Sequence, residues 1–291
     1  MALHTLTEKI FDCIYTFGEN LDLIDNFQVV TKKINRLLHL KEENKENYLY
    51  DLNGNIIFSK VSIYVENKVI LKDINFIIEQ GQRVAIIGDN GSGKSILAKT
   101  ILGFYKYEGN IYINNHNIRK LNKADIRKYV ELILGESYMF SGSLIDNIKL
   151  YNDVDMGTIE KIAIDCDIKE DIDRFEEGYN TLIGEKGTKL SGGQKQRVSI
   201  ARSLASNKPI LILDEALNKL DNNTRKNILS NLVNKYSSKT IIFISNNLGI
   251  INYIDVIIYI DGKTTAVGTH EELLTKNKNY KNLIEINEDV I

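Results

Sequence analysis

Hydrophobic and polar positions divide the chain into a helical start and a longer part in which strands alternate with helices. Over residues 1–40, apolar residues recur at three- and four-residue steps, which predicts a helix. The polar run KEENKEN at 41–47 predicts a linker or a solvated helix end. Strand-like segments begin near residue 51. We therefore expect an N-terminal helical segment over 1–50 and a larger domain over 51–291.

In the larger domain, short apolar runs alternate with helical patterns. The segments NIIFSKVSIYV and DINFIIEQG predict strands near its start. The runs at 83–87, 209–214 and 240–245 predict buried strands with apolar centres, and within the last of them residues 241–244 are continuously apolar, as in a strand covered on both faces. Residues 120–190 are predicted to be mostly helical. This order indicates an α/β fold with a parallel sheet. The sequence contains no internal repeat, which excludes two tandem copies of one module.

Composition and charge narrow the possible partners and the compartment. The net charge of −2 over 291 residues gives no reason to expect nucleic acid or an anionic membrane surface as a partner. Cys13 and Cys166 have no pairing motif or metal-ligand spacing, which favours reduced thiols in a cytoplasmic protein. No window is apolar enough for a membrane helix, and Glu8, Lys9 and Asp12 interrupt the place where a signal peptide would be apolar. We expect a chain that does not cross a bilayer by itself.

The stretch GDNGSGKS at 88–95 matches the phosphate-binding pattern G-x-x-x-x-G-K-[ST]. It lies between a predicted strand and a predicted helix, so its backbone N–H groups and the positive end of the helix would face a phosphate. Lys94 would reach the β- and γ-phosphates, and the Ser95 hydroxyl would be a ligand of Mg²⁺. The predicted nucleotide-binding residues here are Gly88, Asp89, Asn90, Gly91, Ser92, Gly93, Lys94, Ser95 and Ile96.

A second motif, ILILDEA at 210–216, supplies two acidic residues at the end of a buried strand. Asp214 is suited to hold Mg²⁺ together with Ser95, and Glu215 is suited to polarise an attacking water. Acidic pairs at strand ends are common, so this motif gains its weight from the phosphate loop.

The third motif, LSGGQKQR at 190–197, begins a predicted helix whose first amides could face a γ-phosphate. A plain capped helix is the structural alternative. With this motif, the sequence resembles the ATP-binding domain of ABC transporters, whose signature is LSGGQ. The resemblance implies a P-loop NTPase (RecA-like) core, with an antiparallel β-subdomain and a helical signature subdomain. It also implies ATP and Mg²⁺ as cofactors. Two such domains would pair head-to-tail, so that Ser191, Gly192, Gly193 and Gln194 bind the partner's nucleotide.

Further stretches are similar to ABC exporters in particular. YNTLIGEKGTKLSGGQKQR resembles the exporter segment that touches the membrane domain, and Glu185 is its matching residue. FSGSLIDNI at 140–148 and VGTHEELL at 267–274 also resemble exporter domains. NLDLIDNFQVVTKKINRLLHL is similar to the last membrane helix of bacterial peptide and bacteriocin exporters, although charges interrupt it; a solvent-facing helix is an equal alternative. The resemblance implies membrane-spanning partner domains and a position on the cytoplasmic face of the cell membrane.

Three positions depart from the family pattern. Asn246, at the end of the strand TIIFIS, stands where the family has its switch histidine, so it is our candidate for a catalytic position. Gly135 stands at the position of the glutamine that senses Mg²⁺ and water. The aromatic residue that stacks on adenine aligns with Val65, one residue after Tyr64, and such a slip turns a strand side chain to the opposite face unless a bulge intervenes.

These departures leave two functional hypotheses. The first is the ATP-hydrolysing subunit of an ABC exporter, with slow turnover because two sensors of the γ-phosphate are replaced. The second is an ATP clamp or regulatory subunit that acts with a competent ABC partner, which the retained Glu215 argues against. Neutral drift at these positions is a further alternative. An ABC ATPase working on DNA or ribosomes fits poorly, because the chain has neither a second such domain nor a basic excess.

Overall fold

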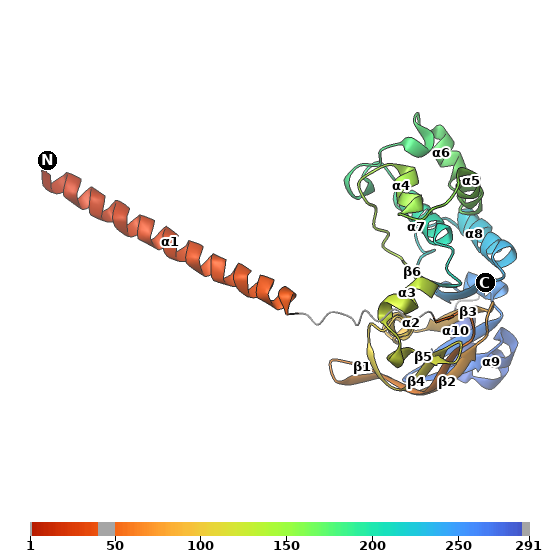
Figure 1. The fold of residues 1–291 in the computed structure, drawn as a ribbon. Helices are drawn as coiled ribbons and strands as arrows, with labels where there is room; N and C mark the ends of the chain where they lie inside the picture. Colours follow the sequence, from red (N-terminus) through yellow and green to blue (C-terminus); the bar gives the residue numbers. More distant parts are fainter. Residues whose placement is uncertain (1, 40–49, 287–291) are drawn as a thin grey trace. The chain divides into compact units, whose positions relative to one another are not determined.

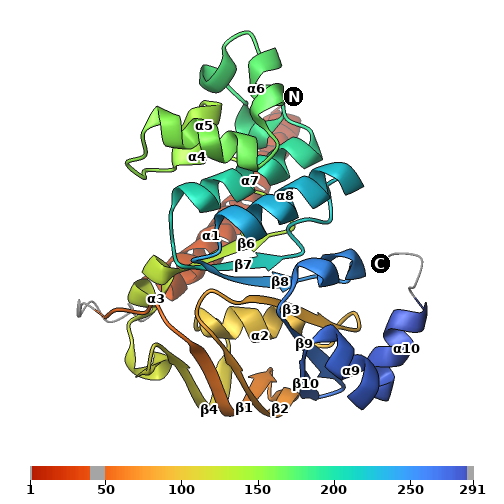
Figure 2. The same ribbon diagram turned by 90° about the vertical axis from the view of Figure 1, so that its right-hand side faces the viewer.

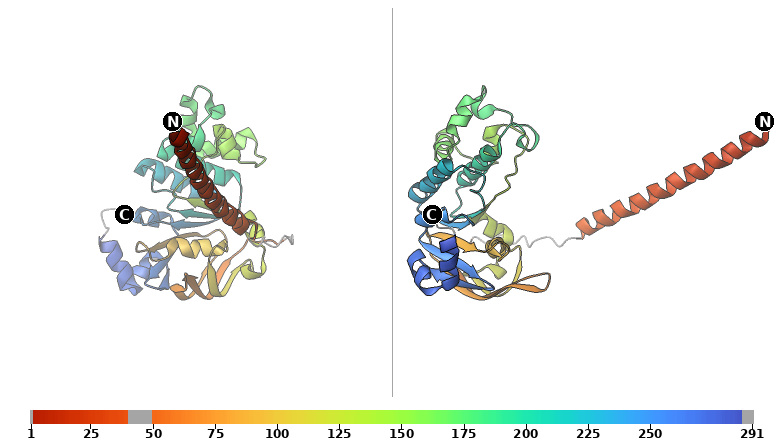
Figure 3. Two further views of the ribbon diagram at one scale, coloured as in Figure 1. Left: turned by 90° about the vertical axis from the view of Figure 1, so that its left-hand side faces the viewer. Right: turned by 180° about the vertical axis from the view of Figure 1, so that it is seen from behind.

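The computed structural model describes residues 2–39 and 50–286, which belong to two compact units, 1–44 and 45–291. The predicted linker at 41–47 lies outside the described residues. In the first unit the predicted helix is present as α1 (Ala2–Leu38), one continuous helix in Figure 3. Many of its apolar side chains are exposed, for example Phe11, Phe27 and Leu38. Among the described helices, none combines the length and the apolar character that a membrane span requires.

The second unit is built on a six-stranded sheet. Its strand order is β10-β9-β3-β8-β7-β6, with all neighbours parallel except β10, which is antiparallel to β9. The bounds are β3 (Arg83–Gly88), β6 (Val130–Leu134), β7 (Ile210–Asp214), β8 (Thr240–Ile244), β9 (Val256–Asp261) and β10 (Thr264–Gly268). The three runs predicted as buried strands are therefore parallel strands, and their carboxyl ends meet at one edge of the sheet.

Hydrophobic side chains on the two faces of this sheet belong to two separate cores. In β7, Leu211 and Leu213 join one cluster, whereas Ile210 and Ile212 join the other. Figure 2 shows α7 (Gly192–Ala205) and α8 (Asn222–Lys235) on one side of β7 and β8, and α2 (Lys94–Ile101) on the other side. Because alternate residues of a strand face opposite sides, a strand between two helical layers is apolar at every position.

A four-stranded antiparallel sheet forms the predicted β-subdomain, in the order β2-β1-β4-β5. Its bounds are β1 (Ile56–Val65), β2 (Lys68–Ile78), β4 (Lys106–Ile113) and β5 (His116–Asn117). Buried and more exposed residues alternate along β1 as far as Ile63, except that two less buried residues, Ser59 and Lys60, separate Phe58 from Val61 at a register shift. Such alternation is typical of a sheet that packs one face on a core. Most of the alternate side chains, such as Ile56, Phe58, Val61 and Ile63, pack into the same core as α2.

The segment from 120 to 190 is only partly helical, so the prediction that this stretch is mostly helical is wrong. VELIL forms β6 instead, because a short apolar run fits a buried strand as well as a helix. The helices in this part of the chain are α3 (Lys123–Tyr129), α4 (Leu144–Lys149), α5 (Met156–Asp165) and α6 (Lys169–Arg174). In Figure 1, α4 to α7 gather at the end of this unit opposite β1, β2 and β4. The expected fold class, a parallel-sheet core with antiparallel and helical subdomains, is confirmed.

The remaining elements complete the second unit. They are the 3₁₀ turns η1 (Ile118–Lys120), η2 (Gly178–Asn180), η3 (Glu185–Gly187) and η4 (Leu248–Tyr253), and the helices α9 (His270–Lys276) and α10 (Lys278–Ile286). Of the two C-terminal helices, α10 packs Tyr280 into the core beside Tyr259 of β9, with ring centroids 5.4 Å apart.

Candidate functional site

The glycine-rich loop joins the end of β3 to the start of α2, as the motif predicts. Gly93 immediately precedes the helix in a left-handed backbone conformation, with φ of 101°. A Cβ atom at Gly93 would lie 2.7 Å from the Ile70 side chain, so glycine meets both a conformational and a steric requirement there. At the loop's tip Gly91 also has a positive φ of 80°, and a Cβ there would meet no atom within 4 Å. The loop is thus open on one side and closely packed on the other.

The ammonium group of Lys94 lies inside this loop. It donates hydrogen bonds to the carbonyl oxygens of Gly88 at 2.7 Å and Asp89 at 2.8 Å. Burial lowers the pKa of Lys94, and the charges of Glu215, Asp89 and Asp214 oppose that shift. A lysine held in this way places one positive charge among the loop amides at the positive end of α2.

Two oxygen ligands suited to a divalent cation meet where α2 faces the end of β7. The Ser95 hydroxyl donates to Oδ1 of Asp214 at 2.6 Å. The sheet order brings the two residues together, since β8 alone separates β3 from β7. A hydroxyl and a carboxylate are hard oxygen ligands of the kind that Mg²⁺ takes beside substrate phosphates. Sequence reasoning missed one neighbour: Nζ of Lys99 lies 2.9 Å from Oδ2 of Asp214.

A cavity of about 530 Å³ adjoins this pair. Its lining comes from the ends of β6 and β7, from α2 and from the loop after β7: Ser95, Lys99, Leu134, Gly135, Glu136, Asp214, Glu215, Asn218 and Lys219. The structure therefore brings the predicted residues Ser95, Asp214, Glu215 and Gly135 to one cavity. The residues that line this cavity thus include a hydroxyl, several carboxylates and two lysines.

Glu215 holds an unusual backbone conformation beside Gly135. Its φ is +55°, and its N–H donates to the carbonyl oxygen of Ile244 at 3.0 Å. Left-handed conformations cost non-glycine residues about 1–2 kcal/mol. A Cβ atom at Gly135 would lie 3.1 Å from the Glu215 carbonyl oxygen. The backbone at Gly135 thus approaches Glu215 so closely that a side chain there would require a small displacement.

Asn246, just after β8, lies beside the glycine-rich loop. Its amide Nδ2 donates to Oδ1 of Asn90 at 2.6 Å, and both residues line a smaller cavity of about 180 Å³ with Gly88 and Asp89. Both side chains are exposed. The amide at the end of β8 is therefore within reach of the glycine-rich loop, at the position expected from the strand.

The signature residues begin α7 with a capping box. Ser191 Oγ accepts from the Gln194 N–H at 3.2 Å, and Gln194 Oε1 accepts from the Ser191 N–H at 2.9 Å. Gly192, which is exposed, and Gly193, which is half-buried, form the first turn, and a Cβ at Gly192 would meet no atom within 4 Å. These residues do not line either of the two cavities just described. The signature and the phosphate loop of one chain are therefore not brought together.

Three partly buried hydrogen bonds join α7 to α6 and to the end of β6, and the sequence motifs alone did not identify them. Gln194 Nε2 donates to Asp171 of α6 at 3.0 Å. The buried Gln196 accepts from Ser137 at 2.7 Å and donates to the Leu134 carbonyl at 3.2 Å. Gln196 thereby joins α7 to the end of β6, next to Gly135.

The candidate adenine-stacking residues lie elsewhere, at the end of β1. The register of β1 against β2 shifts between Ile63 and Tyr64, so an irregularity of the kind that could turn Tyr64 to the other face is present. The Tyr64 hydroxyl donates to Glu108 at 2.9 Å, and this bond raises the pKa of Tyr64. Tyr64 and the half-buried Val65 do not line the two cavities beside the loop.

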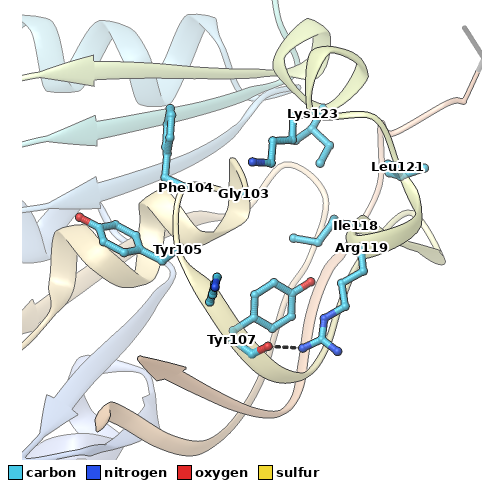
Figure 4. A pocket seen from close by; sticks show the side chains of 10 residues that line it. Gly103, Phe104, Tyr105, Tyr107, Ile118, Arg119, Leu121 and Lys123 are labelled. Carbon is cyan, nitrogen blue, oxygen red and sulfur yellow. Dashed lines mark hydrogen bonds between the residues drawn. The ribbon is translucent and has the colours of Figure 1, made fainter. Parts of the chain in front are cut away.

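A further cavity, of about 550 Å³, lies beside β4 and α3 (Figure 4). Arg119 stacks over the Tyr107 ring, with its guanidinium carbon 4.4 Å from the ring centroid, and donates to the Tyr107 carbonyl. None of the predicted nucleotide-binding residues lines it.

Comparison with known proteins agrees with this geometry. The family model described as "ABC transporter" matches residues 71–218. The pediocin PA-1 transport/processing ATP-binding protein PedD of Pediococcus acidilactici is 38% identical over 245 residues, which cover 81% of this chain and 33% of that protein. The alpha-hemolysin translocation ATP-binding protein HlyB of Escherichia coli is 35% identical over 277 residues, covering 91% and 39%.

Two more matches extend the likeness. The transport/processing ATP-binding protein ComA of Streptococcus pneumoniae is 32% identical over 268 residues, which cover 88% of this chain and 37% of ComA. A solved structure of a bacterial Atm1-family ABC exporter with ATP bound superposes with a TM-score of 0.82 at 31% identity, covering 91% of this chain and 48% of that one. The chain spans about a third of the length of these curated relatives. The family model, the relatives and the phosphate loop all point to the same family. The chain therefore belongs to the ABC transporter family and carries that family's ATP-binding domain.

Proposed function

We propose that this chain binds and hydrolyses ATP as the ATPase subunit of an ABC exporter, and that the cargo is a peptide or bacteriocin. The observation that carries the proposal is the 2.6 Å contact between Ser95 and Asp214, with Glu215 next in sequence and Lys94 inside the phosphate loop. The names of PedD and ComA, which are transport/processing proteins, support the peptide cargo.

The residues present fit Mg²⁺ and a triphosphate. Ser95 and Asp214 would hold the cation, and Lys94 with the loop amides would hold the phosphates. Ser92 Oγ, in the same loop, is buried and makes no hydrogen bond among the described residues, as suits a hydroxyl that donates to a phosphate oxygen. When bound, Mg²⁺ would neutralise part of the phosphate charge.

Glu215 is the proposed general base, since its carboxylate lines the cavity next to Asp214. It would accept a proton from the water that attacks the γ-phosphorus. The bond from that phosphorus to the bridging oxygen then breaks, and ADP and phosphate leave. Asn246 would donate a hydrogen bond from the end of β8, in place of an imidazole that could also carry charge.

A second ATPase domain would complete the site, and the isolated signature supports this part of the proposal. Ser191, Gly192 and Gly193 are exposed or half-buried at the start of α7 and line neither loop cavity. In a head-to-tail dimer they would meet the nucleotide of the opposite subunit, which is either a second copy or another ABC ATPase. Membrane-spanning exporter domains would be the other partners, on the cytoplasmic face of the cell membrane.

A second candidate function is a slowly hydrolysing ATP clamp that acts with a competent partner. The observation that favours it is the pair of departures: Asn246 offers only an amide, and Gly135 offers no side chain toward Glu215. Loss of one well-placed catalytic hydrogen bond costs about 10²–10³ in rate, while the intact loop preserves binding.

Steady-state ATP turnover separates the two candidates, with ATP binding measured on the same samples. For an ATPase subunit, Glu215→Gln lowers turnover about 100-fold or more and retains ATP binding, since a general base contributes about 10²–10⁴-fold. Lys94→Ala serves as the control that loses binding. Turnover in the original chain that equals the Glu215→Gln variant, with ATP bound, would favour the clamp. Absence of ATP binding in the original chain would refute both.

A further inference from the structure

Asp214 is the most buried carboxylate that faces the candidate site. Its side chain is 7% exposed, and each of its two oxygens already has a partner: Oδ1 accepts from Ser95 at 2.6 Å, and Oδ2 lies 2.9 Å from Lys99 Nζ. A buried carboxylate without a compensating charge is costly, so the Lys99 ammonium stabilises this one.

Lys99 reaches Asp214 because of its place on α2. It follows Ser95 by four residues, so both side chains project from the same face of the helix. The Lys99 side chain is 28% exposed and lines the 530 Å³ cavity, which gives its ammonium group room to move away from the carboxylate. A buried and fixed lysine would not have this freedom.

A divalent cation held by Ser95 and Asp214 would occupy the space beside the same carboxylate. Two cations a few ångströms apart repel each other strongly when they are shielded from water. The carboxylate therefore interacts fully with either the ammonium or the metal, but not with both. Glu136 and Glu215 also line the cavity and offer Lys99 other acidic neighbours on that wall.

We infer that Lys99 is a positioning residue that replaces Mg²⁺ as the counter-ion of Asp214 when no metal is bound. By competing for this carboxylate, Lys99 weakens Mg²⁺ binding and keeps Asp214 in place between cycles. The inference rests on the proposed function, since it uses the metal site formed by Ser95 and Asp214.

The test compares Lys99→Met with the original chain in urea unfolding, first with EDTA and then with saturating Mg²⁺ and ATP. Methionine keeps much of the side-chain volume and removes the charge. We expect a lower urea midpoint for Lys99→Met in EDTA, and a difference that shrinks by at least half with Mg²⁺ and ATP. Lys99→Arg should stay near the original chain in both conditions. Lys219→Met removes the same charge from another residue that lines this cavity and should leave the EDTA midpoint nearly unchanged.

A second readout follows Mg²⁺ directly. We expect the Mg²⁺ concentration for half-maximal binding of a fluorescent ATP analogue to fall about 10-fold in Lys99→Met, since removing a competing charge favours the metal. An equal midpoint difference in both conditions, or an unchanged Mg²⁺ dependence, would overturn the inference and leave a purely structural ion pair. If the original chain is not stabilised by Mg²⁺ and ATP at all, the proposed function fails instead.

Discussion

At the residue scale, two positions that depart from the family pattern, 246 and 135, bear on the proposed ATP hydrolysis. Asn246 reaches the phosphate loop, as its 2.6 Å bond to Asn90 shows. Its amide donates a hydrogen bond but does not carry a charge or transfer a proton at neutral pH, whereas a histidine does both. Gly135 contributes only backbone next to Glu215. Since Lys94, Ser95 and Asp214 are in place, these differences should slow hydrolysis more than they weaken binding.

Asn246→His should therefore raise ATP turnover about 10-fold or more, because a well-placed acid–base group contributes about 10²–10⁴-fold. Asn246 is exposed, so an imidazole fits without disturbing the core. The measurement is the turnover number at saturating ATP, with nucleotide affinity measured in parallel and Asn246→Ala as the control. Turnover in the histidine variant no higher than in the alanine variant would show that position 246 does not act on the phosphate.

At the scale of elements, an ion pair fixes the start of β3 to the start of β9. The Arg83 backbone N–H and Nε donate to Oδ2 of Asp255 at 2.8 and 2.7 Å, and the Asp255 N–H donates to the Arg83 carbonyl at 2.9 Å. Burial would raise the pKa of Asp255, but the bonds from Arg83 and its charge bring the pKa below its ordinary value. Because β3 leads directly into the phosphate loop, this contact also supports the site.

Asp255→Asn should lower the free energy of unfolding by about 1 kcal/mol near neutral pH, a value reduced because both side chains are about a third exposed. Since the folded pKa is depressed, the contribution is complete above the unfolded value of about 3.9 and is lost as pH falls through the folded pKa. The measurement is urea unfolding from pH 7 to pH 2. The free energies of unfolding of the original chain and of Asp255→Asn should converge only at the acidic end of this range. A difference that stays constant down to pH 2 would contradict this account.

At the scale of the whole molecule, the two compact units differ in what they bury. The unit over 45–291 holds two hydrophobic cores, one on each side of the six-stranded sheet. In α1, by contrast, large apolar side chains such as Phe11 and Phe27 are more than 70% exposed. A run of exposed apolar residues of this size is typical of an interaction surface or an aggregation liability.

Removing residues 2–44 should leave the melting temperature of the remaining chain within about 2 °C of the original, because its cores lie within 45–291. It should also reduce self-association, seen by light scattering at equal protein concentration. For a domain of this size, about 1 kcal/mol changes the melting temperature by about 2–4 °C. A fall of more than 4 °C would therefore mean that the helix stabilises the ATP-binding unit.

Sequence patterns predicted the features that are local in the chain. The phosphate loop follows a buried strand, and LSGGQ begins a helix, so both appear where expected. VELIL was missed as a strand because five apolar-rich residues do not distinguish a strand from a helix turn. The Lys99–Asp214 pair could not be predicted, because it depends on the sheet order that places β7 near β3. The face of the sheet from which the Tyr64 side chain projects depends on a register shift between β1 and β2, which no local pattern encodes.

The positive φ of Glu215 sets stability and activity against each other at one position. Glycine adopts this backbone conformation without the cost that a side chain brings, so a glycine there would relieve strain. It would also remove the carboxylate that faces the cavity. Laboratory evolution that selects this chain only for heat resistance should therefore drift toward glycine at 215, whereas selection for the proposed ATP hydrolysis should retain the acid. A thermostable variant obtained in that way would be the less active protein.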